Sequence, residues 1–392
     1  MTEQLPSLLI SIPEGVIDLG WGHPSPSLHP TEAIRTAMDR VLSNGSVTAL
    51  QYGATQGFGP LLESLAAFLS QEPAYAMVVS PRNLFISSGA SQALDLATTL
   101  LARPGDTVFV EEPSYYLIES IFRDHGLNVI GVPTDHNGLR TDSLEAMLAD
   151  ADIPNPALLY IIPTYQNPSG AVLPIERRQK LVELAIEYEF MVLADEVYQL
   201  LHYGDPPPPP LVAYDQSDQG CVASIGSFSK ILAPGLRIGW VQGNSRLISR
   251  FSNAGMVISG GGVSHFTSVI ANATLELGLL QENVRKLRQV YAGRVEAICQ
   301  SLGKHLNAVA EFALPGGGYF VWVKLNGNVD TEKLLPMAQE AGLSYRPGTA
   351  FSARGAFSDR LRLAFALYEP DQLDEGVQRL ATALHRYESV KG

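Results

Sequence analysis

The sequence has little cysteine and no excess of positive charge. Its two cysteines, Cys221 and Cys299, stand far apart in 392 residues, a spacing that provides neither a disulfide framework nor a cluster of metal ligands. Lys and Arg number 27 against 40 Asp and Glu, a formal net charge of -13, and such a surface disfavours nucleic acid as a partner. We therefore expect a protein of the reducing cytoplasm without a metal site.

The sequence also contains no apolar run of membrane-spanning length, so no membrane partner is expected. The stretch from Leu5 to Pro13 has no Lys or Arg and lacks the pattern of a secretory signal. What is present is a hydrophobic content of 46% in a long chain, which suggests two domains. We expect a large domain over residues 46–284, a small C-terminal domain over 285–392, and an N-terminal segment, 1–45, packed with the small domain or along the cleft between the two.

Short apolar runs alternate with amphipathic helices between about residues 85 and 245. This alternation predicts an α/β fold with a mostly parallel sheet covered on both faces. Helical spacing of apolar residues covers 93–101 and 175–188, and further helices are expected near 281–294 and 373–387. The predicted strands are Thr107–Val110, Ala157–Ile162, Phe190–Ala194, Val222–Ile225 and Ile238–Gln242.

The distribution of lysine singles out one side chain. Residues 1 to 285 contain two lysines, Lys180 and Lys230. Lys180 follows Arg177 and Arg178 in a run that indicates the polar, solvated face of a helix. Lys230 instead lies just beyond a predicted buried strand. A desolvated lysine has a lowered pKa and attacks carbonyl carbon, which is the chemistry of Schiff-base lysines.

Residues around Lys230 suit a phosphate. Ser227 and Ser229 offer hydroxyl groups, and Arg237 carries a planar guanidinium that binds phosphate through paired N–H groups. Upstream, the segment with Ala90 and Ser91 turns from a strand into a helix, whose free N–H groups and dipole favour an anion. Taken singly, Arg237 is also explained as a surface ion-pair partner, and the turn as an ordinary helix cap.

Other polar residues also follow predicted strands. Asp195 comes directly after one, Tyr198 lies three residues later, and Asn167 and Tyr115 follow two more. A buried carboxylate needs a cationic partner, such as the protonated nitrogen of a pyridine ring. Tyr198 and Asn167 can then bond a phenolic oxygen on the same ring, and Tyr115 can stack on its face. Read singly, Asn167 fits a proline-rich turn and Tyr115 fits core packing. Because parallel strands end at one edge, we expect all of them in one site.

These residues belong to motifs that resemble those of the class I/II aminotransferases, the fold-type I group of enzymes that use pyridoxal 5'-phosphate. The resemblance covers nearly the whole chain. It implies a large domain with a mostly parallel seven-stranded sheet flanked by helices, and a smaller α/β domain. The motifs are Tyr52-Gly-Ala-Thr-Gln-Gly, Ser88-Gly-Ala-Ser-Gln-Ala-Leu, Glu112-Pro-Ser-Tyr, Gln166-Asn-Pro-Ser-Gly, Ala194-Asp-Glu-Val-Tyr, Ser227-Phe-Ser-Lys with Pro-Gly-Leu-Arg-Ile-Gly, and Arg360-Leu-Arg-Leu.

The resemblance also assigns roles. It makes Lys230 the Schiff-base residue and the proton carrier, and pairs Asp195 with the pyridine nitrogen. Arg362, which the family pattern picks over Arg360, is expected to grip the substrate's α-carboxylate with the Gly22 backbone closing over it. Asn167 and Tyr198 are expected to bond the cofactor's phenolic oxygen, and Asn167 also to contact the substrate. Tyr115 is expected to stack on the ring face. The residues expected around the phosphate are Ala90, Ser91, Ser227, Ser229 and Arg237. Tyr52 reaches the phosphate of a neighbouring subunit, which implies a homodimer.

The reaction that the resemblance implies is transamination. An amino group moves from an L-α-amino acid to a 2-oxo acid by a ping-pong mechanism through Lys230. The alternative is a lyase or cyclase that acts at the β- or γ-carbon of an amino acid in a biosynthetic pathway. A regulator that binds the cofactor is less expected, because no DNA-binding module precedes Ile17 and the chain is acidic.

The substrate is the least determined property. We find no clear second cation for a dicarboxylate side chain, so a neutral, aromatic or mixed range is expected, and His23, His265 or Tyr319 can tune it. The glycine-rich segment Gly260-Gly262 departs from the family's pattern, and either shapes the substrate pocket or is a plain turn. The tract Pro206 to Pro210 is interpreted as a stiff surface loop.

Overall fold

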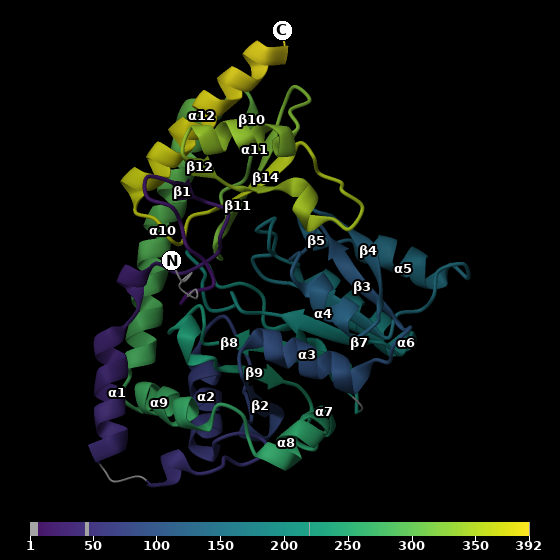
Figure 1. Cartoon of the computed structure of the whole chain (residues 1–392). Helices are drawn as coiled ribbons and strands as arrows, with labels where there is room; N and C mark the ends of the chain where they lie inside the picture. Colours follow the sequence, from purple (N-terminus) through teal and green to yellow (C-terminus); the bar gives the residue numbers. More distant parts are fainter. Residues whose placement is uncertain (1–6, 44–46, 219, 392) are drawn as a thin grey trace, which may run out of the picture.

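The computed structural model describes residues 7–43, 47–218 and 220–391 (Figure 1). Within these ranges, no helix combines the length and apolar character that crossing a bilayer requires. The same residues also contain no cluster of three or more His, Cys, Asp or Glu side chains that is arranged to hold a metal ion.

The larger of the two main sheets has eight strands. Five adjacent strands in the centre run parallel to one another. The last two strands on one side and the single edge strand on the other side are each antiparallel to the neighbouring strand nearer the centre. The order across the sheet is β2 (Leu84–Ser87), β9 (Gly239–Gln242), β8 (Val222–Ser227), β7 (Met191–Asp195), β6 (Leu158–Ile161), β3 (Thr107–Glu112), β4 (Asn128–Asp135) and β5 (Gly138–Leu139). The predicted seven-stranded, mostly parallel sheet is therefore present, and the two-residue β5 adds an eighth strand.

Helices cover both faces of this sheet, as Figure 1 shows. Side chains alternate between the faces along each strand: in β6, Leu158 and Tyr160 join one apolar core, and Leu159 and Ile161 join the other. Burial on both faces explains why these strands read as continuous apolar runs. The first core includes α3 (Ala90–Leu101), α4 (Ile118–Asp124), α7 (Ser245–Ser252) and α8 (Gly255–Gly260), and the second includes α5 (Thr141–Ala149) and α6 (Ile175–Glu187).

A smaller antiparallel sheet follows in the C-terminal part. Its strand order is β10 (Ala310–Glu311), β11 (Phe320–Leu325), β14 (Arg360–Ala364) and β13 (Arg346–Pro347). Its apolar core is shared with α10 (Leu279–Leu306), α11 (Thr331–Glu340) and α12 (Pro370–Lys391). The expected boundary between residues 284 and 285 falls inside α10, which runs as one continuous helix.

The N-terminal segment contacts both parts of the molecule. Its strand β1 (Ile17–Asp18) pairs in parallel with β12 (Leu343–Ser344) beside the smaller sheet. Its helix α1 (Thr31–Ser43) packs against α9 (His265–Glu276) through Ala37, Val41, Val269 and Ile270. Helix α2 (Gly59–Gln71) also packs on α9. The chain between β1 and α1 therefore passes between the two parts of the molecule, where Gly22 lies.

Candidate active site

One cavity of about 800 Å³ collects almost all of the predicted site residues. It lies at the edge where the parallel strands end: Asp195 is the last residue of β7, Ser227 the last of β8, and Asn167 follows β6. Ligands of open α/β sheets bind at this edge. The predicted residues in its wall are Gly22, Ala90, Ser91, Tyr115, Asn167, Asp195, Tyr198, Ser227, Ser229, Lys230, Arg237 and Arg362.

Lys230 projects into this cavity and is half-buried. Its Nζ donates a hydrogen bond to the backbone oxygen of Gly22 at 2.9 Å and lies 5.2 Å from the centre of the Tyr319 ring. Burial lowers the pKa of the Lys230 amine to about 8, although the negative charge of Asp195 opposes the shift. A larger fraction of this amine than of an ordinary lysine is therefore neutral and nucleophilic near neutral pH.

The two carboxylate oxygens of Asp195 have different surroundings. Its Oδ2 accepts a hydrogen bond from the Tyr160 hydroxyl at 2.8 Å, whereas its buried Oδ1 has no hydrogen-bond partner in the part of the chain that the structure describes. Burial raises the pKa of this carboxyl to about 6. A buried acceptor without a donor is costly, so the site fits a ligand that brings a cationic N–H group, such as a protonated pyridine nitrogen.

Another part of the cavity wall fits a phosphate. Helix α3 begins at Ala90, and its first N–H groups have no partners within the helix. Arg237 donates to the Ser229 hydroxyl at 3.4 Å and to the Ser88 backbone oxygen at 3.1 Å. Gly89, with φ at +84°, makes this approach possible, because a Cβ there would lie 2.5 Å from the Arg237 guanidinium. A guanidinium and a helix N-terminus thus face the same part of the cavity.

Arg362 supplies a buried cation near Lys230. It is 2% exposed and donates to Asn167 Oδ1 at 2.7 Å and to the Gly20 backbone oxygen. Its guanidinium lies 4.1 Å from the centre of the Phe320 ring. Burial lowers its pKa to about 10, so the group stays charged at neutral pH. A buried arginine held by neutral acceptors is suited to bind a carboxylate.

Tyr52 is the predicted residue that lies elsewhere. Its side chain is 88% exposed, and the cavity wall in the described residues does not include it. The segment Gly260-Gly262 lies beside it: the Gly262 N–H donates to the Gly53 backbone oxygen at 2.9 Å, and a Cβ on Gly262 would lie 2.1 Å from the Ala54 backbone oxygen. These glycines therefore let two backbones pack closely, and the cavity wall in the described residues does not include them.

The three residues suggested to tune the substrate range have different positions. His23 lines the cavity, and its pKa is lowered by burial and by the charge of Lys230. Tyr319 is fully buried behind the wall, with its ring 5.2 Å from that of Tyr198. His265 bonds the Thr48 backbone oxygen near Gly53. Within the described chain, His23 alone of the three belongs to the wall.

Two further residues contact the cavity wall from behind, and the sequence did not identify them. Tyr160, which bonds Asp195, stands inside an apolar strand and was indistinguishable from a core residue. Arg346 lies on the strand next to Arg362, with its guanidinium 4.2 Å from the centre of the Trp21 ring. Arg346 could be placed beside Arg362 only once the pairing of β13 with β14 was known.

Comparisons with known proteins agree with this geometry. The family model "Aminotransferase class I and II" matches residues 14–380. The chain is 34% identical over 371 residues to aromatic-amino-acid aminotransferase 1 of Thermococcus litoralis, covering 94% of this chain and 88% of the relative. The relatives are named as aminotransferases, and this favours transamination over elimination or cyclisation as the reaction of this chain.

Two solved structures have the same fold. The multiple substrate aminotransferase of Thermococcus profundus superposes with a TM-score of 0.88 at 34% identity, covering 96% of this chain and 93% of the other. LysN of Thermus thermophilus, an α-aminoadipate aminotransferase complexed with N-(5'-phosphopyridoxyl)-L-leucine, gives 0.86 at 29% identity, with 96% and 94% covered. The chain therefore belongs to the class I and II aminotransferase family and is a fold-type I, pyridoxal phosphate-dependent aminotransferase.

Proposed function

We propose that this aminotransferase accepts a broad range of L-α-amino acids, including aromatic ones and 2-aminoadipate. The observation that carries the proposal is the make-up of the cavity wall, in which one buried cation, Arg362, accompanies a largely apolar surface that includes Trp21, Leu94, Tyr116 and Leu117. A wall of this kind holds apolar side chains without demanding one shape. The relatives named for aromatic amino acids, for multiple substrates and for α-aminoadipate support the same range.

The proposed division of labour follows from position and charge. Bound pyridoxal phosphate supplies an electron sink for the electrons released at the substrate's α-carbon. Lys230 holds the cofactor and then moves the proton to and from that carbon, for which a pKa near 8 is suitable. Asp195 holds the ring nitrogen in its protonated form, and Arg362 with the Gly22 backbone orients the α-carboxylate. Donor and acceptor use one site in turn, which gives ping-pong kinetics.

Contacts with the rest of the cofactor follow the same logic. Asn167 and Tyr198 reach the phenolic oxygen, and Tyr115 covers the ring face. The phosphate is held at another part of the cavity wall by Ala90, Ser91, Ser227, Ser229 and Arg237. Apart from Ala90, which offers its backbone N–H at the start of α3, these residues have polar or aromatic side chains and line the same cavity, which supports their assignment to a single ligand.

A donor screen tests the substrate range. The purified holoenzyme is assayed with phenylalanine, tyrosine, kynurenine, 2-aminoadipate, methionine and aspartate, each with 2-oxoglutarate or pyruvate as acceptor. We expect parallel double-reciprocal lines and kcat/KM values within about a hundredfold of one another for all donors except aspartate, since a methylene group more or less changes apolar binding by only about 1–3 kcal/mol. Strong activity with one donor and none with the rest would contradict the broad range.

We also propose a homodimer in which Tyr52 serves the neighbouring site. Tyr52 is 88% exposed, and Val47 and Leu50 nearby are each 75% exposed. The bridge between Gly53 and Gly262 joins this segment to the region of Met256 and Ile258, which are 53% and 61% exposed. Adjacent exposed apolar side chains of this number mark interaction surfaces, and a second copy of the chain is the proposed partner.

Mixing two impaired variants at a cofactor concentration too low to load Tyr52→Ala tests this arrangement. Tyr52→Ala is expected to weaken cofactor binding about tenfold or more, because a hydrogen bond to a charged phosphate is worth about 1.5–3 kcal/mol. Refolding Tyr52→Ala together with Lys230→Ala should restore part of the activity, because a mixed dimer has one site with an intact Lys230 and an intact Tyr52 from the other subunit. A monomer in sedimentation, or mixtures without recovered activity, would refute the shared site.

A cytoplasmic location, in amino acid metabolism, is the last part of the proposal. It is supported by the low cysteine content and by two cysteines without a disulfide partner. Fractionation of the source cells followed by immunoblotting tests it, and recovery of the protein with membranes or outside the cell would contradict it.

A further inference from the structure

Two arginines lie side by side next to the cavity. Arg346 on β13 is the register partner of Arg362 on β14. Residues directly opposite each other in an antiparallel pair project from the same face of the sheet, about 5 Å apart at their Cβ atoms. Arg362 projects into the cavity, so Arg346 projects toward the same region from the neighbouring strand.

Aromatic rings hold Arg346 in place. Its guanidinium carbon lies 4.2 Å from the centre of the Trp21 ring and 5.6 Å from that of Tyr116, and both rings belong to the cavity wall. A guanidinium that stacks by its face keeps its N–H groups available at its edge. The Arg346 cation therefore lies against two rings of the cavity wall, although the wall in the described residues does not include Arg346 itself.

No acidic side chain neutralises either arginine within residues 7–43, 47–218 and 220–391. Neither forms a salt bridge with an Asp or Glu there, and the buried Nε of each has no hydrogen-bond partner. Elsewhere the chain has ample carboxylates, since its net charge is -13. The positive charge of Arg346 also contributes to the lowered pKa of Arg362. Two adjacent cations without a counter-ion form a region that attracts more than one negative charge.

We propose that Arg346 is a specificity-determining residue that binds the second carboxylate of long acidic substrates, while Arg362 binds the α-carboxylate. This inference rests on the proposed function and adds the substrate class to it: 2-amino dicarboxylic acids long enough to reach from Arg362 to the edge of the Trp21 and Tyr116 rings. With neutral or aromatic substrates, Arg346 stays stacked and the rings alone form the wall. One cavity thereby serves both kinds of side chain.

The decisive comparison is between 2-aminoadipate and norleucine, which have equally long carbon chains and differ in the terminal carboxylate. In Arg346→Gln, kcat/KM for 2-aminoadipate should fall about tenfold or more, through KM, while kcat/KM for norleucine changes less than twofold. Arg346→Lys should keep part of the preference, because it retains the charge but not the planar group. Binding of the unreactive pair adipate and hexanoate, measured by calorimetry on the holoenzyme, should change in the same ratio.

Arg360→Gln is the matched control. Arg360 lies on β14 with Arg362, is stacked 5.9 Å from the Phe357 ring and has Asp359 as an acidic neighbour, so its loss should leave the ratio unchanged. Equal losses for both substrates in Arg346→Gln would mean that Arg346 supports the α-carboxylate or the wall, and would overturn the inference. An unaltered ratio would overturn it as well. If the unmodified holoenzyme transaminates neither amino acid, the proposed range fails instead.

Discussion

Replacing Lys230 by alanine is expected to lower kcat by about 10²–10⁴-fold, the usual contribution of a positioned proton-transfer group. The amine lies where the predicted site residues meet, bonded to the Gly22 backbone and beside the Tyr319 ring. Alanine has neither a nucleophile nor a proton carrier. Covalent attachment of the cofactor should be lost, which borohydride reduction followed by peptide mass spectrometry measures directly: the unmodified protein should carry the label on the peptide with Lys230.

The pH dependence of attachment follows from the lowered pKa. Only the neutral amine attacks the cofactor's aldehyde, and the pKa of Lys230 is about 8, so about a quarter of the amines are neutral at pH 7.5, against about one in a thousand for an ordinary lysine. The rate at which the cofactor-free protein binds pyridoxal phosphate covalently should therefore rise as pH increases to about 8 and level off above it. A rise that continues past pH 10 would contradict the lowered pKa.

Lys180 provides the matched control. It is the other lysine in the first 285 residues, lies on the exposed side of α6 and pairs with Glu145 at 2.7 Å. Lys180→Ala should keep kcat and covalent attachment within twofold of the unmodified protein. If Lys230→Ala is as active as Lys180→Ala, the assignment of the Schiff-base residue is wrong.

The position of the site could be predicted from the sequence because it depends on a general property of parallel sheets. Asp195 and Ser227 both end parallel strands, and such ends meet at one edge whatever the order of the strands. Recognising the strands was therefore enough to bring these residues together. The neighbouring apolar runs were unambiguous, since strands that are buried on both faces contain few polar residues.

Contacts that depend on which strands are neighbours could not be predicted. Tyr160 bonds Asp195 because β6 pairs with β7, with Tyr160 opposite Leu193 and Asp195 two residues further on the same face. Arg346 depends in the same way on the pairing of β13 with β14. The sequence around Tyr160 and around Arg346 contains no information about which strand lies beside each of them. These two supporting residues could therefore be identified only from the structure.

One interpretation of the sequence was wrong. Arg178 was placed on the solvated face of a helix, yet its side chain is fully buried. The spacing explains this position, because the buried residues of α6 include Arg178, Leu181, Val182 and Ala185, an i, i+3, i+4, i+7 pattern that puts the arginine at the start of the apolar stripe. The nearby Pro206 to Pro210 tract is likewise more than a surface loop, since Pro207 and Pro210 are buried and two of its backbone oxygens bond buried side chains.

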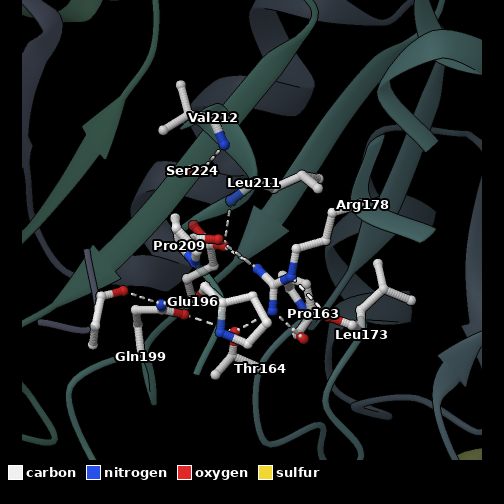
Figure 2. Close-up of polar contacts among 12 residues, drawn as sticks. Pro163, Thr164, Leu173, Arg178, Glu196, Gln199, Pro209, Leu211, Val212 and Ser224 are labelled. Carbon is white, nitrogen blue, oxygen red and sulfur yellow. Dashed lines mark hydrogen bonds and ion pairs between the residues drawn. The ribbon is translucent and has the colours of Figure 1, made fainter. Parts of the chain in front are cut away.

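The buried Arg178 joins three segments around the site (Figure 2). Its guanidinium donates to the backbone oxygens of Pro163 at 2.7 Å and Leu173 at 2.8 Å, the two ends of the turn that contains Asn167. It also donates to Pro209 of the proline tract at 2.9 Å. Its ion-pair partner is Glu196, 3.6 Å away and next to Asp195 in sequence. One cation thus fixes the positions of segments that supply two proposed cofactor contacts.

Arg178→Met is therefore expected to lower the free energy of unfolding by about 3–5 kcal/mol, the usual result of removing one partner from a buried ion pair. Methionine fills part of the volume but leaves Glu196 without the Arg178 cation. It also removes the arginine's hydrogen bonds to the backbone oxygens of Leu173, Pro209 and Pro163, of which Pro163 keeps the Leu173 N–H as a donor. Urea unfolding of the cofactor-free protein measures the change, and the refolded variant should also bind pyridoxal phosphate more weakly. Arg178→Lys should be intermediate, since it keeps the charge but cannot bond all of the same oxygens.

An exposed ion pair of the same kind is the control. Arg140 and Asp142 form a salt bridge at 2.6 Å with side chains 45% and 66% exposed, and Arg140→Met should cost less than about 1 kcal/mol. The double variant Arg178→Met with Glu196→Gln separates charge from hydrogen bonding, because it removes both ions. If the double variant regains about half of the lost stability, the uncompensated Glu196 carboxylate is the main cost. If it regains none, the main cost is the loss of the hydrogen bonds that Arg178 donates to backbone oxygens. Equal stability of Arg178→Met and Arg140→Met would mean that the buried network contributes nothing.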